Sequence, residues 1–236
     1  SGSIIFALVQ QAATEAGVEL SANSADRLTT HARMMLDANA VMNLTRITEW
    51  DAVVRLHIID SIAWLNRIDV LEGRIADIGS GAGFPGVAIE IVTGVPVLLC
   101  ESVGKKAAFL EEVQRELGLR GGVYVGRAED LAREQRGEFS TVTARALSGM
   151  PSLVELAAPL LATGGRLIAM KASPDVGEME SASRAALICG MSEPTLIPYS
   201  LGVSDVSRSL LISARVSEPE LALPRRNGLA QRRPLG

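Results

Sequence analysis

From Arg74 onward, short apolar runs alternate with longer segments in which apolar residues recur every three or four positions. Short apolar runs are typical of strands buried on both faces, and the recurring positions are typical of helices. We expect strands near 74–78, 96–101, 122–126, 140–144, 165–171, 194–199 and 208–216. We expect helices near 84–93, 104–117, 150–162 and 174–187.

This alternation predicts the fold class. Apolar strands followed by amphipathic helices form right-handed βαβ units, and such units build a parallel sheet with helices on both faces. No long helix separates the last two strands, so they should form an antiparallel pair at one edge. The prediction is an α/β fold with a doubly wound, mostly parallel, seven-stranded sheet.

The first seventy residues have a different pattern, which predicts helices without strands. Apolar residues recur at helical spacing near 3–16 and 24–40, and a third helix should run to about His57. No linker rich in proline or serine follows, so this part should pack on the later domain. We therefore expect a helical extension, a ligand-binding domain and a basic tail, at 1–70, 71–218 and 219–236.

The segment Arg74–Gly86, RIADIGSGAGFPG, combines a buried strand, a glycine-rich turn and the start of a helix. Glycine permits positive φ and lets a ligand approach the backbone closely, and a helix N-terminus adds free N–H groups. The pattern G-x-G-x-x-G, which begins at Gly81, matches a dinucleotide-binding fingerprint but is weak evidence alone. Asp77 in the strand and Glu101 after it are acids placed where a nucleoside site would need them.

Ligands of open α/β sheets bind outside the carboxyl ends of the strands. The glycine turn follows the first strand, and Glu101 ends the second, where a carboxylate can accept hydrogen bonds from ribose hydroxyls. Glu129 follows the third strand, where a backbone N–H and an acid could meet an adenine edge, although these residues also suit a helix start. Arg145 follows the fourth strand, where it faces either the ligand or a surface salt bridge.

These features predict a nucleoside cofactor, either S-adenosylmethionine or a nicotinamide dinucleotide. Gly83 and Glu101 are 18 positions apart, close to the roughly 20 typical of dinucleotide folds, so the spacing does not separate the two. A dehydrogenase usually carries a second domain with its own proton-transfer residues, whereas only about 65 residues follow the fifth strand. The length therefore favours S-adenosylmethionine.

The composition argues against several classes of function. Aromatic residues make up 3% of the chain, which argues against single-strand binding mainly by stacking. The two cysteines are far apart with no Cys-x-x-Cys pair, so we expect no metal site and a reducing compartment, the cytoplasm. Apolar runs are too short for a membrane span and no basic leader is present, so we expect no membrane partner.

The net charge of −4 conceals an uneven distribution. Residues 221–236 contain four arginines and no acidic residue, which leaves −8 for the rest of the chain. A basic tail can bind phosphate even on an acidic protein, and a solvated, disordered C-terminus is the equally weighted alternative. The four residues are Arg225, Arg226, Arg232 and Arg233.

Several separated motifs make the chain resemble the bacterial 16S ribosomal RNA guanine-N7 methyltransferases of the glucose-inhibited division protein B family. In chain order they are NLT at 43–45, HIIDS at 57–61, DIGSGAGFPG at 77–86, ESVGKKAAFL at 101–110, RAED at 127–130, TARAL at 143–147, MK at 170–171 and LPRRNGLAQRRPL at 223–235. Glu101 stands where the family more commonly has aspartate. The match covers nearly the whole chain and is far more specific than the glycine turn alone.

The resemblance implies a class I, Rossmann-like methyltransferase that uses S-adenosylmethionine. It would methylate N7 of a guanine in 16S rRNA (position 527 in the standard rRNA numbering), in free RNA or in the small ribosomal subunit. The implied cofactor contacts are Gly79, Gly81, Gly83, Phe84, Glu101, Ala128, Glu129 and Arg145. The expected RNA phosphate contacts are Lys171, Arg225, Arg226, Arg232 and Arg233. For Lys171 the alternative is a side chain that only reaches the surface. We expect a monomer.

Guanine N7 has a free in-plane lone pair and no proton, so its methylation needs no general base. We therefore assign no catalytic residue and expect an in-line displacement that depends on positioning. The positioning candidates are Asn43, His57, Arg145 and Lys171. A turn role for Asn43 and a packing role for His57 are the alternatives. Three other functions remain open: an NAD-dependent oxidoreductase, a methyltransferase acting on a small molecule, which the arginine tail argues against, and a non-catalytic RNA-binding protein on the same fold.

Overall fold

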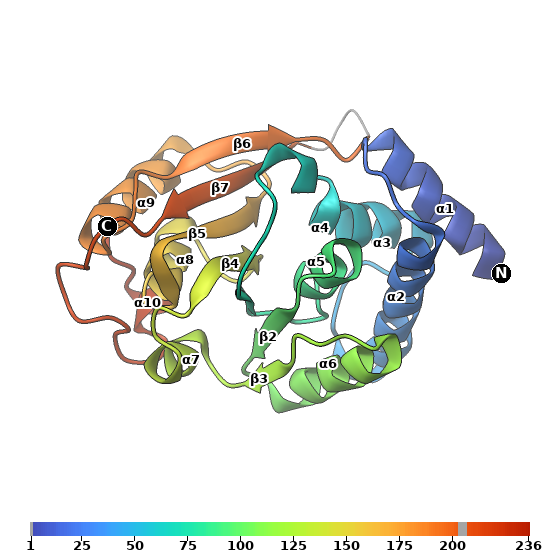
Figure 1. Ribbon diagram of the computed structural model, residues 1–236, viewed down its shortest axis with the longest axis horizontal. Helices are drawn as coiled ribbons and strands as arrows, with labels where there is room; N and C mark the ends of the chain where they lie inside the picture. Colours follow the sequence, from blue (N-terminus) through green and yellow to red (C-terminus); the bar gives the residue numbers. More distant parts are fainter. Residues whose placement is uncertain (1, 203–206) are drawn as a thin grey trace.

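The computed structural model describes residues 2–202 and 207–236, and a seven-stranded sheet forms its centre (Figure 1). The strands are β1 (Ile75–Ile78), β2 (Val97–Glu101), β3 (Val123–Val125), β4 (Phe139–Arg145), β5 (Leu161–Lys171), β6 (Thr195–Tyr199) and β7 (Arg208–Ala214). Their order is β3-β2-β1-β4-β5-β7-β6. β1 to β5 are parallel, and β7 is antiparallel to both β5 and β6. The predicted sheet, with its antiparallel edge pair, is confirmed.

Helices cover both faces of the sheet (Figure 1). One face carries α1 (Gly2–Glu15), α2 (Ala22–Met42), α3 (Trp50–Val53), the π-helix η1 (Val54–Ile59), α4 (Asp60–Ile62), the 3₁₀ helix η2 (Leu65–Arg67), α5 (Gly86–Thr93) and α6 (Gly104–Leu117). The other carries α7 (Ala128–Glu134), α8 (Met150–Ala157), α9 (Val176–Ile188) and α10 (Leu229–Arg232). Within the described residues, no helix has the length and apolar character that crossing a membrane requires.

The two apolar cores reflect the alternation of side chains along the strands. In β1 every residue is buried, yet Ile75 belongs to the core on the α5 side while Ala76 and Ile78 belong to the core on the α8 side. Asp77 is on the same side as Ile75, beneath the start of α5. The predicted N-terminal helices α1 and α2 pack into the first core through residues such as Leu28.

Three local features differ from the sequence prediction. α8 ends at Ala157 rather than near residue 162, because Pro159 has no N–H with which to continue the helical hydrogen bonds and the chain turns into β5 at Leu161. The tail contains the short helix α10, which the sequence pattern did not predict. The third N-terminal helix widens into the π-helix η1, which contains His57. Such π segments occur frequently at functional sites.

Candidate functional site

Two cavities open along the carboxyl ends of the parallel strands, around the point where the strand order reverses between β1 and β4. The first encloses about 400 Å³ including its open mouth, and the second about 750 Å³. Ala146 lines the second cavity and Leu147 lines the first, so the cavities are neighbours at the end of β4.

The first cavity is bounded by residues that follow β1, β2 and β3, by α7 and α8, and by the C-terminal tail. These residues are Gly79, Cys100, Ser102, Gly126, Arg127, Ala128, Glu129, Leu147, Leu156 and Gln231. Gly79, Ala128 and Glu129 are among the predicted cofactor contacts. Gln231 is a lining residue that the sequence reasoning did not single out, because nothing local relates it to the glycine turn.

The glycine turn is fixed to the neighbouring strand through its backbone. The N–H of Gly79 donates to the carbonyl oxygen of Cys100 at 2.9 Å. Gly79 has φ +68°, and a Cβ at this position would lie 2.5 Å from the Cδ1 of Leu147. Gly81 has φ +56°, and its Cβ position has only the Gly79 carbonyl oxygen nearby, at 3.8 Å. The turn therefore needs glycine, and it leaves open space above Gly81.

Glu101 lies against this turn, as the sequence predicts. Its Oε2 accepts a hydrogen bond from the N–H of Gly81 at 2.9 Å, and its Oε1 accepts one from the N–H of Val103 at 2.8 Å. A carboxylate has about four acceptor positions, so further hydroxyl donors can still bind. Glu101 is itself buried and is not in the cavity lining, so its contact with a ribose stays a prediction.

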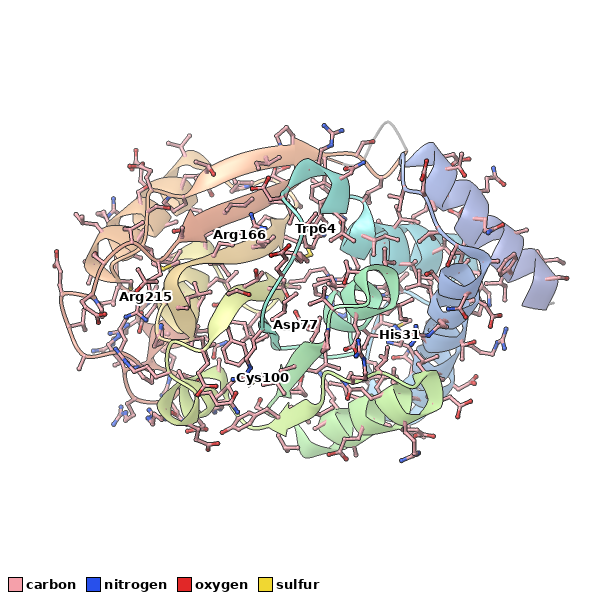
Figure 2. The ribbon with its side chains drawn as sticks, viewed as in Figure 1. His31, Trp64, Asp77, Cys100, Arg166 and Arg215 are labelled. Atoms are coloured by element: carbon pink, nitrogen blue, oxygen red, sulfur yellow. The ribbon has the colours of Figure 1, made fainter. Side chains whose placement is uncertain are left out.

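Asp77 is completely buried, at the centre of the sheet, on the strand next to that of Cys100 (Figure 2). Its Oδ1 accepts a hydrogen bond from the hydroxyl of Thr143 at 2.7 Å, whereas its Oδ2 has no hydrogen-bond partner. Burial raises the pKa of this carboxyl group to about 6. The strand thus holds an acid directly behind the glycine turn with one unused acceptor oxygen.

The thiol of Cys100 in the first cavity is not activated. Burial, which is the largest effect, and nearby acidic groups raise its pKa to about 12. A thiol with this pKa stays protonated near neutral pH and is not a nucleophile there.

The second cavity is lined mainly by side chains from η1, α4 and the ends of β4, β5 and β7. These residues are Ile47, Leu56, His57, Asp60, Arg145, Ala146, Met170, Lys171, Ala172 and Arg208. Three of the predicted residues meet here, namely His57, Arg145 and Lys171. The sequence reasoning missed Arg208, because it is more than sixty positions from Arg145 and only the pairing of β7 with β5 brings it to this edge.

Asp60 organises the cations of the second cavity. Its Oδ1 accepts hydrogen bonds from the hydroxyl of Tyr199 at 2.7 Å and from the Nε of Arg208 at 3.2 Å. Its Oδ2 forms an ion pair with Arg145 at 3.7 Å. Asp60 is 5% exposed, so its charge requires these partners. The carboxylate therefore holds two arginines at the rim of one cavity.

His57 connects the N-terminal extension to Arg145. Its Nδ1 is 3.1 Å from Nη2 of Arg145, which can only donate, so Nδ1 is an acceptor. The proton of the neutral ring is then on Nε2, which donates to the hydroxyl of Thr45 at 2.8 Å. Burial, followed by the positive charge of Arg145, lowers the pKa of His57 to about 3. His57 is thus neutral, with both ring nitrogens engaged.

Phe84 lies within a stack of rings beside the second cavity. Its ring centroid is 4.2 Å from that of His31 and 5.4 Å from that of His57, and the guanidinium of Arg145 lies 5.7 Å from the same centroid. A Cβ on Gly83 would lie 3.0 Å from Nε2 of His31. Phe84 and Arg145, both predicted cofactor contacts, therefore lie toward the second cavity.

The two remaining positioning candidates, Lys171 and Asn43, lie in different parts of the structure. Lys171 lines the second cavity and pairs with Glu178, with 2.9 Å between Nζ and Oε1. Asn43 is exposed and caps the C-terminus of α2 in a left-handed conformation, with φ 52° and ψ 52°. It is in the lining of neither cavity, which matches the turn alternative.

The four arginines of the tail are in two different environments. Arg225 donates two hydrogen bonds of 2.6 Å to the carboxylate of Glu155, which is 2% exposed. Arg226, Arg232 and Arg233 are exposed. The positive charge of Arg225 is therefore balanced within the protein, and the other three side chains face solvent.

Comparison with known proteins gives one family. Residues 24–201 match the family model described as rRNA small subunit methyltransferase G. The chain is 35% identical to a protein of that name from Desulfitobacterium hafniense, over 92% of each chain. It is 36% identical to another from Carboxydothermus hydrogenoformans, over 86% of this chain and 88% of the relative.

Solved structures share the fold at low sequence identity. A geranyl diphosphate methyltransferase in complex with GPP and sinefungin is 15% identical, with a TM-score of 0.55 over 80% of this chain and 99% of that one. The [4+2]-cyclase SpnF is 12% identical, with a TM-score of 0.53 over 80% and 96%. These two proteins differ in chemistry, so the likeness concerns the fold alone.

Proposed function

This chain belongs to the rRNA small subunit methyltransferase G family, and on that premise we propose that it methylates N7 of one guanine in 16S ribosomal RNA. The chain is an S-adenosylmethionine-dependent ribosomal RNA methyltransferase, and membership removes the oxidoreductase alternative. The choice of guanine N7 and of its position in the RNA extends beyond the family description. It rests on the sequence motifs and on the chemistry of the second cavity.

The residues around the first cavity fit the cofactor. The open space above Gly81 gives a ligand room against the backbone, and the acids Glu101 and Glu129 supply acceptors for ribose hydroxyls and an adenine amine. S-adenosylmethionine supplies a methyl group on a positively charged sulfur when bound. We place the nucleoside end near Gly79, Ala128 and Glu129, with the methyl group directed toward the second cavity.

The proposal rests on one observation, the excess of donors in the second cavity. Arg145, Lys171 and Arg208 can only donate hydrogen bonds, and a guanidinium has five N–H groups, more than the contacts of Arg145 with Leu56 and His57 occupy. The potential acceptors His57 and Asp60 already accept from Arg145, Tyr199 and Arg208. The N7 and O6 edge of guanine presents only acceptors, whereas the matching edge of adenine includes an amino group. Donors of this cavity therefore fit O6 of guanine and leave N7 for the methyl group.

Methylation of N7 needs no base, because this nitrogen carries no proton. N7 attacks through its own lone pair, and His57, the side chain that elsewhere might take a proton, is neutral with both nitrogens engaged. The protein then contributes mainly by holding the two reactants in line, which can lower a barrier by roughly 7–11 kcal/mol. His57 and Arg145 serve as positioning residues, because their contacts with Thr45 and Asp60 fix the cavity wall.

We also propose that the exposed arginines 226, 232 and 233 contact RNA phosphate, along with Lys171 at the rim of the second cavity. Arg232 and Arg233 directly follow Gln231, which lines the first cavity, so their positions fit a substrate that runs across the strand ends. Arg225 has a structural role instead, because Glu155 already binds its guanidinium. The enzyme would act in the cytoplasm as a monomer, without a metal ion.

The test is to map the product on RNA. The protein would be incubated with labelled S-adenosylmethionine and either naked 16S rRNA or 30S subunits, and N7-methylguanine located by borohydride and aniline cleavage. We expect label at one guanine and none when that guanine is replaced by adenine. Label at another atom would contradict the proposed N7 product. Label in no RNA, with cofactor binding intact, would contradict the proposal and favour the non-catalytic alternative.

A further inference from the structure

The C-terminal tail is packed into the groove between α7 and α8. Besides the Arg225–Glu155 pair, the amide of Asn227 donates to Asp130 at 2.9 Å, and its side-chain oxygen accepts from Arg133 at 2.7 Å. The side chains of Leu223 and Ala230 are buried in the core beneath this segment. The tail therefore has apolar and polar anchors on the domain.

The same segment reaches the cofactor cavity in two ways. The N–H of Gly228 donates to Oε1 of Glu129 at 2.7 Å, so a tail amide holds one of the acids of that cavity. Three positions later, Gln231 is in the cavity lining beside Glu129 and Leu156. A primary amide at the mouth offers both a donor and an acceptor. The tail has other anchors on the domain besides these two contacts.

The geometry points to a second role for the tail, which we propose is a wall of the cofactor site. Gln231 contacts the nucleoside end of the cofactor, and the Gly228 amide orients Glu129 toward it. The inference rests on the proposed placement of S-adenosylmethionine in the first cavity. It assigns the C-terminal residues to cofactor binding as well as to RNA.

This arrangement links the two ligands. Arg232, adjacent to Gln231, is exposed, and so is Arg226 near the start of the tail. RNA phosphate bound to these arginines would favour the docked tail, and the docked tail completes the cofactor wall. By thermodynamic reciprocity, cofactor and RNA would then each bind more tightly in the presence of the other. A tail that bound only RNA would give no such coupling.

The decisive experiment is titration calorimetry with S-adenosylhomocysteine on the full chain. We expect Gln231→Ala to weaken binding about five- to tenfold, the effect of one lost hydrogen bond of roughly 1 kcal/mol. Gln11→Ala, a matched substitution on α1 away from both cavities, should bind as the wild type does. We expect Gln231→Asn to bind more tightly than Gln231→Ala, because it retains the amide. Native affinity of Gln231→Ala would overturn the inference.

A second measurement separates this inference from the proposed function. Adding 16S rRNA should raise the affinity of the wild type for S-adenosylhomocysteine by a few-fold, and this gain should be smaller in Gln231→Ala. If Gln231→Ala methylates rRNA and binds the cofactor with unchanged affinity, the proposal that the tail forms a wall of the cofactor site is refuted. The proposed function is not affected by that result. Weaker cofactor binding in Gln231→Ala, together with a wild type that methylates no RNA, would refute the proposed substrate and leave the wall intact.

Discussion

The two cavities at the strand ends are built by different means. The first is built around a glycine turn whose backbone N–H groups bond to Cys100 and Glu101 in the adjacent strand. The second is formed from side chains, with two arginines held by Asp60 and a neutral His57 beside them. A backbone site tolerates changes of side chain away from its glycines and acids, whereas a side-chain site depends on every member of its network.

The largest effect should come from the carboxylate of the second cavity. Asp60→Ala leaves Arg145 and Arg208 without their shared partner in a mostly buried setting, and breaking such a pair costs about 3–5 kcal/mol. We expect that loss in the free energy of unfolding, measured with denaturant, and methyl transfer reduced at least a hundredfold. Cofactor binding under conditions where the variant is folded should change little. An equal loss of cofactor affinity would show that the cavities are one site.

A comparable loss of stability should follow from removing Arg225, which anchors the C-terminal tail beside the first cavity. Arg225→Ala leaves Glu155, a carboxylate at 2% exposure, with only the backbone N–H of Leu235, and we expect about 3 kcal/mol less stability. Arg226→Ala is the matched control, because that side chain is exposed, and should change stability by less than about 0.5 kcal/mol. Similar melting temperatures for the two variants would argue against the anchor.

The acid behind the glycine turn predicts a pH dependence. The pKa of Asp77 is raised to about 6 from 3.8, so between these values the folded state binds more protons than the unfolded state. The stability contribution of Asp77 is then fully present below about pH 4 and is lost as the pH rises through 6, by about 3 kcal/mol. Denaturant unfolding at pH 4 and pH 7 should show this difference in the wild type relative to Asp77→Asn. Parallel pH profiles would contradict the prediction.

The smallest expected effect concerns Glu101, the acid that lies against the glycine turn. Glu101→Ala removes the acceptor for Gly81 and for the predicted ribose contact, and we expect cofactor affinity to fall by about 2 kcal/mol, roughly thirtyfold. Calorimetry would measure this, and Glu101→Asp, which restores the acid common in the family, should recover part of the affinity. If both variants bind as the wild type does, the ribose assignment fails.

The sequence by itself determined the features that depend on nearby residues. The apolar runs predicted all seven strands. β1 and β2 are buried on both faces, which leaves an almost uninterrupted apolar signal, whereas β3 and β6, at the two edges of the sheet, are partly exposed. The sequence predicted that the glycine turn and Glu101 lie close together, because consecutive parallel strands end at the same edge of a sheet. The first cavity was therefore largely predictable, apart from the part that the tail supplies.

Only the tertiary structure decided the rest. Asp60, Arg145 and Arg208 belong to three separate segments, and no local pattern predicts that an antiparallel β7 will place its first residue beside β5 and α4. The tail has a charge pattern that predicts RNA contact, yet Arg225 pairs with a buried glutamate and Gln231 lines the first cavity. Local sequence determines which conformations the chain adopts, whereas the partner of a charge depends on which distant segment packs against it.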